Sequence, residues 1–393
     1  MLILIGIDKM NFFTPNTYID LVTLAEHRGI DPNKFTVGIG QSKMAVPTIT
    51  QDTVSMGANA SLPILDAYDL NKIDLIVVGT ETGIDESKSS ASFIHQLLNI
   101  HPFAKSVEVK HACYGATAGL MMAKDYIKAH PGRKALVIGS DISRYGLNTS
   151  GEVTQGAGAV AMLISENPRI LEIEDTSVSM TESIFDFWRP NYRDTAIVDG
   201  KFSNEAYVKF FTTIWEEFST RSSYKIADFK AFCFHLPYSK MGKKALLPVL
   251  ENESQEVSDL LLTNYELSTD YTRNIGNIYT GSLYLSLMSL LDSDDNTLKA
   301  NDLIGFFSYG SGAVGEIFSG RLVEGYEKHL LKDEHQTMIN NRYDLSIEEY
   351  EAIFTKELPK TDGIHPLSEA KYDKSHFYLS SISEHQRHYN ERQ

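Results

Sequence analysis

Short apolar runs alternate along this chain with longer segments of helical periodicity, and this alternation constrains the fold more than any other feature. Such a pattern is typical of an α/β protein, in which strands pack between layers of helices. The strand candidates are nearly continuous in apolar residues, as expected of strands that are buried on both faces. We predict strands at residues 75–78, 107–109, 135–138, 159–164, 232–234 and 304–307, and helices at residues 51–67, 117–128, 205–219, 240–250 and 281–291.

Two short segments in the two halves of the chain resemble each other. Residues 154–160 read TQGAGAV and residues 308–314 read SYGSGAV, so both place Gly-x-Gly-Ala-Val before an apolar stretch. Because Gly-x-Gly turns are common, chance and duplication both explain a single pair of this kind. A duplication would give two similar α/β halves with a site at their junction.

The charge and the cysteine count exclude several classes of protein. The chain carries 36 Lys and Arg against 52 Asp and Glu, a net charge of −16, which argues against binding along a nucleic acid backbone. With two cysteines a disulfide framework is excluded, and a reduced, cytoplasmic setting is favoured. No run reaches the ~18 apolar residues of a membrane span, and the short apolar N-terminus is interpreted as a first strand rather than a signal peptide.

Three of the predicted strands lead into a residue that is capable of chemistry. The first of them is followed by Glu81, the second by Cys113 and the fifth by His235. Ligands of open α/β sheets bind at the carboxyl ends of the strands. We therefore expect these three side chains to meet in one cleft.

Each of the three residues also has a purely structural interpretation. Cys113 opens a helix, whose N-terminal N–H groups favour a thiolate nucleophile, but a buried structural cysteine fits the local sequence equally well. His235 either exchanges a proton near neutral pH or is a satisfied surface histidine. Glu81 is either a base or a solvated strand end. Cys233, between two phenylalanines, is interpreted as a core residue.

The absence of common motifs narrows the reaction class further. The sequence has no phosphate-binding loop of the GxxxxGK[S/T] type and no GxGxxG after a strand, and its two cysteines lie too far apart for a structural zinc set. We therefore expect no metal and no bound cofactor. Three lysines follow His235 within ten residues: Lys240, Lys243 and Lys244. They form either a solvated helix face or a local basic patch that binds a phosphorylated substrate.

Nine motifs, through their order and number, carry a resemblance to one family. The chain resembles the 3-hydroxy-3-methylglutaryl-CoA (HMG-CoA) synthases, a branch of the thiolase superfamily, and specifically the bacterial enzymes of the mevalonate pathway of isoprenoid biosynthesis. The resemblance covers essentially the whole chain. Its motifs are GIGQ at 38–41, GTE at 79–81, ACYGAT at 112–117, RYGLN at 144–148, TQGAGA at 154–159, DFWRP at 186–190, FHLPY at 234–238, GNIYTGS at 276–282 and SYGSG at 308–312.

The resemblance implies a fold, an assembly and an acyltransferase activity. The implied fold is a thiolase-like, five-layered α-β-α-β-α core of two similar halves, at residues 1–168 with Glu81 and Cys113, and at residues 169–393 with His235, Asn277 and a C-terminal helical extension. The implied assembly is a homodimer. The implied reaction joins acetyl-CoA, acetoacetyl-CoA and water to give HMG-CoA and free CoA.

The resemblance also implies a role for individual residues. Cys113 would be the nucleophile, Glu81 the base that removes a methyl proton from acetyl-Cys113, and His235 the acid partner that stabilises the new alkoxide. Lys240 and Lys244 would bind CoA. The residues implied in substrate binding are Tyr145, Asn148, Thr154, Asp186, Phe187, Asn277, Tyr279, Ser308 and Gly310.

The chain departs from the family pattern at three places. His111 stands where bacterial relatives commonly have Glu, Ser150-Gly151-Glu152-Val153 replaces Gly-Gly-Glu-Pro, and the loop at 191–194 replaces one that contains Thr-Gly-His. The last departure lies near the expected CoA entrance.

Three other functions fit part of the pattern. A 3-ketoacyl-carrier-protein synthase would also use Cys113, His235 and Asn277, but it generates its carbanion by decarboxylation and needs no glutamate base. A thiolase would need a second catalytic cysteine late in the chain, and none follows Cys233. A non-catalytic scaffold with the same fold is the alternative outside enzymology, and the intact set of reactive residues argues against it.

Overall fold

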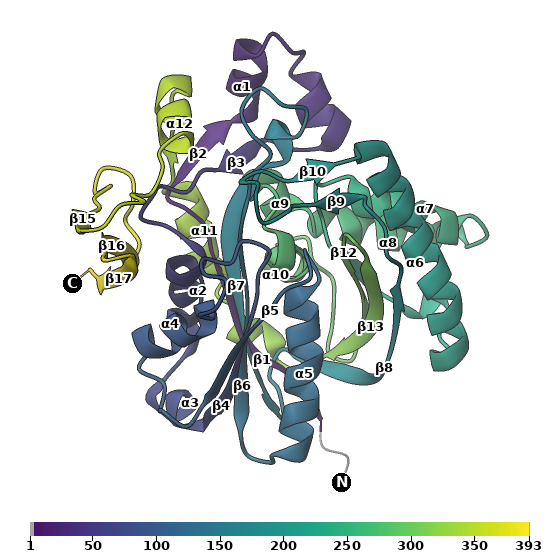
Figure 1. Cartoon of the computed structure of the whole chain (residues 1–393). Coiled ribbons are helices and arrows are strands. Elements are labelled where there is room, and N and C mark those ends of the chain that lie inside the picture. Colours follow the sequence, from purple (N-terminus) through teal and green to yellow (C-terminus); the bar gives the residue numbers. More distant parts are fainter. Residues whose placement is uncertain (1–3, 393) are drawn as a thin grey trace.

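A computed structural model of the chain describes residues 4–392. Its centre is a mixed sheet of nine strands in the order β11-β12-β13-β8-β1-β7-β6-β4-β5 (Figure 1). These strands are β1 (Ile5–Phe13), β4 (Ile73–Gly79), β5 (Lys105–Val109), β6 (Lys134–Ser143), β7 (Gly156–Glu166), β8 (Leu171–Thr181), β11 (Ala231–Phe234), β12 (Leu303–Gly310) and β13 (Val314–Leu322).

The pairing pattern of the sheet occurs twice. β4 runs parallel to β6, β6 antiparallel to β7, and β7 antiparallel to β1. β11, β12, β13 and β8 repeat the same series of orientations, and a short β1–β8 pairing at Gly6 and Ile7 joins the two sets. Residues 156–160 lie within β7, whereas residues 308–310 end β12 and only Val314 belongs to β13, so the two similar segments occupy different positions in the two sets of strands.

Side-chain alternation along β4 explains why helices cover both faces of its set of strands. Leu75 and Val77 belong to the core formed with α5 (Gly115–Ala129), whereas Ile76 and Val78 belong to the core formed with α2 (Thr53–Ser61). In the other set, α10 (Ser282–Asp292) packs on β11 and β12, and α6 (Gly200–Ser222) packs on β8 and β13. α5 and α10 form the middle layer of a five-layered α-β-α-β-α arrangement (Figure 1).

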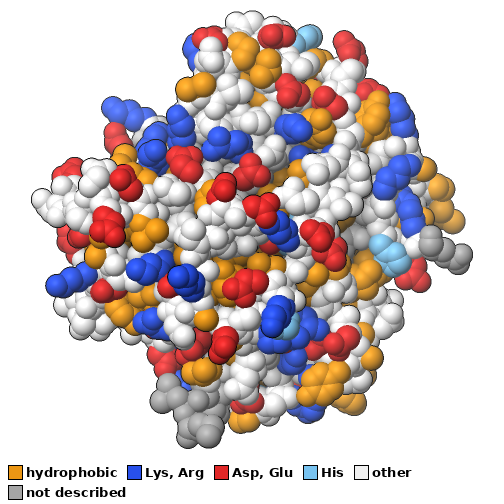
Figure 2. Space-filling model, turned by 180° about the vertical axis from the view of Figure 1, so that it is seen from behind, with side chains coloured by type: hydrophobic (Ala, Val, Ile, Leu, Met, Phe, Trp, Pro, Cys, Tyr) orange, Lys and Arg blue, Asp and Glu red, His pale blue; other side chains and the backbone are white. Residues whose placement is uncertain are grey.

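Smaller elements surround this core. Among residues 4–392, no helix is long and apolar enough to cross a membrane. On the face shown in Figure 2, acidic and basic side chains are interspersed, so this face has no uniformly basic surface. The remaining elements are α1 (Leu21–His27), α3 (Ala67–Lys72), α4 (Ser90–Leu97), α7 (Met241–Leu250), α8 (Gln255–Leu267), α9 (Asp270–Ile275), α11 (Lys332–Asn340) and α12 (Ile347–Phe354), with β2 (Thr17–Asp20), β3 (Lys43–Ala45), β9 (Phe187–Trp188), β10 (Ile197–Val198), β14 (Tyr343–Asp344), β15 (Ile364–Pro366), β16 (Phe377–Ser383) and β17 (Gln386–Glu391).

The structure contains all six predicted strands. It differs from the predictions in three respects: the burial of β5, the end of the helix predicted at 51–67 and the composition of the C-terminal extension. β5 is an edge strand and Val107 is 39% exposed, so it is not buried on both faces. The helix predicted at 51–67 ends at Ser61, where Leu62–Ile64 forms a 3-10 turn that contains Pro63. The expected C-terminal helical extension consists of α11 and α12 followed by the three-stranded sheet β15-β16-β17. β1 begins at Ile5, and residues 1–3 of the predicted first strand, like residue 393, lie outside the described residues.

Candidate active site

Cys113 lies in the loop between β5 and α5, directly before the helix N-cap residue Tyr114. The preceding Ala112 has a φ of +39°, a left-handed conformation that is strained for a residue with a Cβ. Such backbone strain is typical of turns at functional sites, and here it sets the direction of the chain at Cys113. Cys113 is 8% exposed.

The protonation state of Cys113 differs from the expectation for a helix N-terminus. Burial raises the pKa of the Cys113 thiol well above its ordinary value, and the carboxylates of Asp141 and Glu81 raise it further. These contributions outweigh the helix N-terminus, which would favour thiolate. In the free protein Cys113 is therefore a neutral thiol.

A cavity of about 340 Å³ contains seven of the predicted site residues. The remaining lining combines three tyrosines (Tyr207, Tyr238 and Tyr309) and the apolar Met241 and Pro237 with small and polar residues. A mixture of aromatic walls and a few polar groups is typical of a small-molecule site. The predicted residues that line this cavity are Cys113, Tyr145, Thr154, Phe187, His235, Asn277 and Tyr279.

His235 follows the end of β11 and is 2% exposed. Its backbone N–H donates to the carbonyl of Phe307 at 2.9 Å, and its own carbonyl accepts from the Tyr207 hydroxyl at 2.6 Å. The ring Nδ1 has no hydrogen-bond partner among the described residues. Burial lowers the pKa of His235 to about 3, so the imidazole is neutral and can exchange a proton with a ligand in the cavity.

Asn277 is oriented by its neighbours within the same loop. Its side-chain oxygen accepts from the Tyr279 N–H at 2.9 Å and from the Ser282 hydroxyl at 3.0 Å. These two bonds fix the amide plane and leave the NH₂ group as the free donor.

Glu81 lies in a loop that is organised by a buried carboxylate. Asp141, near the end of β6, accepts from the Glu81 N–H at 2.7 Å and from both the N–H and the hydroxyl of Thr82, at 3.0 and 2.7 Å. Asp141 also accepts from Thr280, in the segment that leads into α10. Asp141 thus holds the strand ends of β4 and β6 and the start of α10 in one arrangement.

The carboxylate of Glu81 is bound by Arg189. The Arg189 Nε lies 2.8 Å from Glu81 Oε1, and Nη2 lies 3.3 Å from Oε2 and 2.7 Å from the Glu81 carbonyl oxygen. Burial raises the pKa of the Glu81 carboxyl to about 7, although the Arg189 guanidinium opposes this rise. Near neutral pH the carboxyl is therefore close to half ionised.

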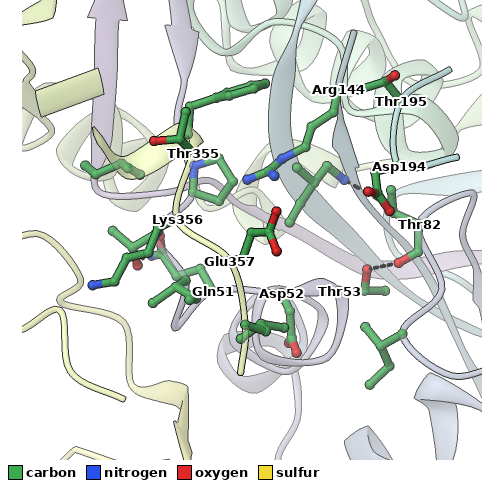
Figure 3. Close-up of a pocket in the computed structure, with 18 of the residues that line it drawn as sticks. Gln51, Asp52, Thr53, Thr82, Arg144, Asp194, Thr195, Thr355, Lys356 and Glu357 are labelled. Carbon is green, nitrogen blue, oxygen red and sulfur yellow. Dashed lines mark hydrogen bonds between the residues drawn. The ribbon is translucent and has the colours of Figure 1, made fainter. Parts of the chain in front are cut away.

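Glu81 and Cys113 line different cavities, contrary to the expectation of a single cleft. Glu81 lines a larger chamber of about 750 Å³ (Figure 3), and Tyr279 lines both this chamber and the Cys113 cavity. The rings of Tyr145, Phe187 and Tyr279 contact one another, with centroids 5.7 to 6.5 Å apart, and pack with Cys113. This aromatic cluster forms the wall between the thiol and the carboxylate.

Four predicted substrate-binding residues do not line the Cys113 cavity. Asn148 is exposed, with a φ of +56°, and Ser308 is buried within β12. Asp186 is fully buried and accepts from the Tyr309 hydroxyl and the Gly312 N–H, both at 2.8 Å. Gly310 packs against the nucleophile loop, since a Cβ at this position would lie 2.7 Å from the Tyr114 Cβ.

The two predicted CoA-binding lysines lie at the rim of the cavity. Lys244 donates at 2.8 Å to the hydroxyl of Tyr238, a lining residue. Lys240 is exposed at the start of α7, beside the lining residue Met241. Both ammonium groups are accessible to a phosphate outside the cavity.

Two residues of this site, Arg189 and Asp141, were not predicted from the sequence. Arg189 stands in the DFWRP motif beside the named residues Asp186 and Phe187, so its place in that motif was an available signal. Asp141 follows the apolar run 135–138, and the rule that selected Glu81 at a strand end would have selected it.

The chain is similar over nearly its whole length to proteins of one enzyme family. A family model described as hydroxymethylglutaryl-coenzyme A synthase N terminal matches residues 4–169, and the corresponding C-terminal model matches residues 171–266 and 258–392. A hydroxymethylglutaryl-CoA synthase from Enterococcus faecalis is 52% identical over 90% of this chain and 92% of its own. A polyketide biosynthesis 3-hydroxy-3-methylglutaryl-ACP synthase from Bacillus subtilis is 32% identical over 98% of both chains.

A crystal structure of an HMG-CoA synthase complexed with CoA superposes with a TM-score of 0.96 at 43% identity, and covers 99% of this chain and 100% of that chain. The thiolase-like, five-layered α/β fold expected from the resemblance is thereby confirmed. The chain belongs to the hydroxymethylglutaryl-CoA synthase family.

Proposed function

We propose that this chain condenses acetyl-CoA with acetoacetyl-CoA and water to form HMG-CoA and CoA, through an acetyl-Cys113 intermediate. The observation that carries the proposal is the joint placement of Cys113, His235 and Asn277 on one aromatic cavity, with Glu81 behind its Tyr279 wall. A condensation without decarboxylation requires a base that can remove a proton from the acyl methyl group, and Glu81 is the candidate base here.

In the first step, the Cys113 sulfur bonds to the acetyl carbonyl carbon as the carbon–sulfur bond of acetyl-CoA breaks. The thiol proton passes to the departing CoA sulfur. Because Cys113 is a neutral thiol in the free protein, this proton transfer must accompany the arrival of the thioester. Neutral His235, which lines the same cavity, is the group that can relay the proton.

In the second step, Glu81 removes a methyl proton from acetyl-Cys113. The resulting carbanion attacks the ketone of acetoacetyl-CoA, and the alkoxide oxygen accepts hydrogen bonds from His235 and from the Asn277 amide. The alkoxide then takes up a proton to become the hydroxyl of the product, and Glu81 gives up the proton that it removed from the methyl group. Burial raises the pKa of the Glu81 carboxyl to about 7, which makes the ionised carboxylate a stronger base and suits it to proton removal. Water then hydrolyses the enzyme thioester, which releases HMG-CoA and regenerates the thiol.

The CoA portion of both substrates is assigned to the rim of the cavity. Lys240 and Lys244 are the exposed cations there, and a phosphate would meet them as the pantetheine arm entered between Tyr238 and Met241. We further propose a homodimer, a cytoplasmic location, and the division of the chain into halves at 1–168 and 169–393.

One incubation tests the function. The protein is mixed with acetyl-CoA and acetoacetyl-CoA, the loss of the acetoacetyl-CoA enolate absorbance is followed, and the product is identified by mass spectrometry. Formation of HMG-CoA supports the proposal. Activity with malonyl thioester alone would favour the decarboxylating alternative, and intact protein that never acquires an acetyl group would favour a scaffold.

A second question is whether the acetyl donor is carried by CoA or by an acyl carrier protein (ACP). The name of the relative from Bacillus subtilis specifies an ACP-linked product, so an acetyl-ACP donor should be compared with acetyl-CoA in the same assay. We expect CoA substrates to be preferred, since the cavity rim carries Lys240 and Lys244 for a CoA phosphate.

A further inference from the structure

The chamber of about 750 Å³ behind Glu81 is larger than the Cys113 cavity, and the proposed reaction leaves most of it unused. It is bounded by the loop before α2, the end of β6, the loop after β9 and the segment that follows α12 (Figure 3). Its size lies within the range of small-molecule sites. Its apolar lining consists of Pro47, Ile49, Ile84, Ile142, Leu147, Ile353, Phe354 and Leu358.

The chamber is lined by five cations and four anions, in a chain whose net charge is −16. Four of the cations are ion-paired, and among the described residues Arg144 has no carboxylate within ion-pair distance. Asp194 is the one lining carboxylate for which the described residues provide no ion pair. The pairs are Arg189 with Glu81 at 2.8 Å, Arg387 with Asp52 at 2.9 Å, Lys360 with Glu357 at 2.9 Å, and Lys356 with Glu369.

Arg144 extends from the end of β6 into the middle of the chamber (Figure 3). Its guanidinium lies 4.9 Å from the centre of the Phe354 ring, which supports it from one side. Burial lowers the pKa of Arg144, and Tyr350 and Asp194 offset this only in part. Arg144 is half-buried, and among the described residues no carboxylate lies within ion-pair distance of its guanidinium, so a bound anion would be stabilised here.

We propose that the chamber binds a small monocarboxylate with an apolar body, and that its carboxylate pairs with the Arg144 guanidinium. A planar carboxylate matches the fork of a guanidinium in bidentate geometry. A single negative charge fits better than several, because only one lining cation lacks a partner and Asp194 would repel a polyanion. The aliphatic lining near Arg144, which includes Ile142 and Leu147, accommodates the apolar body.

A ligand at this place would act on Glu81, a point that rests on the proposed function. Glu81 and Arg189 line the same chamber, so a bound carboxylate adds a negative charge near the base and competes for its guanidinium partner. Both effects favour the protonated form of Glu81. The ligand should therefore slow condensation more than it slows the acetylation of Cys113.

Isothermal titration with octanoate tests the site independently of any activity. The wild-type protein should bind octanoate, and Arg144→Gln should weaken binding by roughly 10- to 100-fold, the usual worth of a charged hydrogen bond. Asp194→Asn should tighten binding, since it removes the repelling carboxylate. Lys360→Gln is the matched control, because it removes a lining cation that is already paired and should leave the affinity unchanged.

Several results would overturn the site. These are the absence of binding to the wild type at millimolar octanoate, equal affinity in Arg144→Gln, or a preference for inorganic phosphate or acetate over octanoate. Folding is checked by thermal melting. Arg144→Gln should melt close to the wild type, because Arg144 is half-buried and makes no ion pair with the described residues, and a large drop would show that Arg144 has a structural partner instead.

The coupling to Glu81 has its own readout. Saturating octanoate should leave the rate of acetyl-Cys113 formation within about twofold and reduce the subsequent reaction with acetoacetyl-CoA about tenfold, in keeping with coupling free energies of this kind. Equal effects on both steps would overturn the coupling while octanoate binding upheld the site. A wild-type protein that never becomes acetylated would overturn the proposed function and leave the binding result standing.

Discussion

Removal of the Arg189 guanidinium should convert a neutral-pH enzyme into an alkaline one. Arg189→Met keeps much of the side-chain volume but removes the contacts to both Glu81 carboxylate oxygens and to the Glu81 carbonyl. Burial, which raises the pKa of Glu81 to about 7, is then no longer opposed by a cation in contact. Glu81 accepts a proton only when it is ionised, so the rate rises with pH through its pKa, and a higher pKa moves this rise to higher pH.

The magnitude follows from the contact distance. A cation within hydrogen-bond distance typically lowers a carboxyl pKa by about 1–3 pH units, so Arg189→Met should move the acid limb upward by about that much. At pH 7 the ionised fraction of Glu81 would fall from about one half to roughly one tenth or less, and the condensation rate at pH 7 should fall about 5-fold or more. On the alkaline plateau the loss should disappear.

The assay should isolate the step that uses Glu81. Enzyme acetylated beforehand on Cys113 is mixed with acetoacetyl-CoA, and consumption of the acetyl group is followed over a range of pH, so that titration of the thiol does not enter. Arg189→Lys, which retains a cation, should restore most of the wild-type profile. An acid limb that stays in place in Arg189→Met, or moves to lower pH, would refute the reasoning, and a uniform loss at every pH would assign Arg189 a structural role.

The remaining predictions concern the other site residues. The Glu81→Ala variant should become acetylated on Cys113 nearly as fast as the wild type, but its condensation rate should fall by roughly 10²–10⁴-fold or more. Both rates are followed by mass spectrometry of samples quenched at set times, and equal loss of both steps would contradict the base assignment. Cys113→Ala should abolish acetylation without lowering the melting temperature, and any substantial remaining condensation would reject the nucleophile. His235→Ala should retain acetylation but turn over acetoacetyl-CoA slowly, and normal turnover would be incompatible with its role. Gly310→Ala should lower both stability and activity, because the new Cβ would lie 2.7 Å from the Tyr114 Cβ beside the nucleophile; a wild-type melting curve would show that the loop yields freely.

The strand ends were readable from the sequence because two simple patterns coincide there. A strand buried on both faces is a continuous apolar run, and the first reactive residue after such a run lies at the edge where ligands bind. His235 follows such a run, whereas Cys113 follows the edge strand β5, and the two residues line one cavity. The same patterns do not report how far apart two neighbouring strand ends are, and Glu81 accordingly lies behind Tyr279 rather than on that cavity.

Arg189 and Asp141 were harder to predict, because their importance depends on contacts between segments that are distant in sequence. Arg189 reaches Glu81 from a loop more than one hundred residues away, and no local periodicity encodes that contact. Asp141 accepts hydrogen bonds from backbone N–H groups, which nearly every residue type carries, so these contacts cannot be predicted from the identities of its partners. The left-handed backbone of Ala112 was equally invisible, since alanine seldom adopts it.

The three reactive groups share a property that residue identity alone does not convey, which is that burial decides their protonation. The Cys113 thiol is neutral because its pKa is raised, His235 is neutral because burial lowers its pKa to about 3, and the Glu81 pKa is raised to about 7. Because these groups carry little charge, the free-energy cost of removing water from them when a thioester binds is small. Each charge then develops only as the reaction proceeds. In the proposed reaction the thiolate forms during acyl transfer, the carbanion forms as Glu81 takes a proton, and the alkoxide forms where the Asn277 amide is already oriented to donate. The position of Tyr279 between the thiol and the carboxylate adds a spatial condition, because the acetyl methyl must reach past this ring before Glu81 can contact it, whereas the acetyl carbonyl reacts with Cys113 in the open cavity.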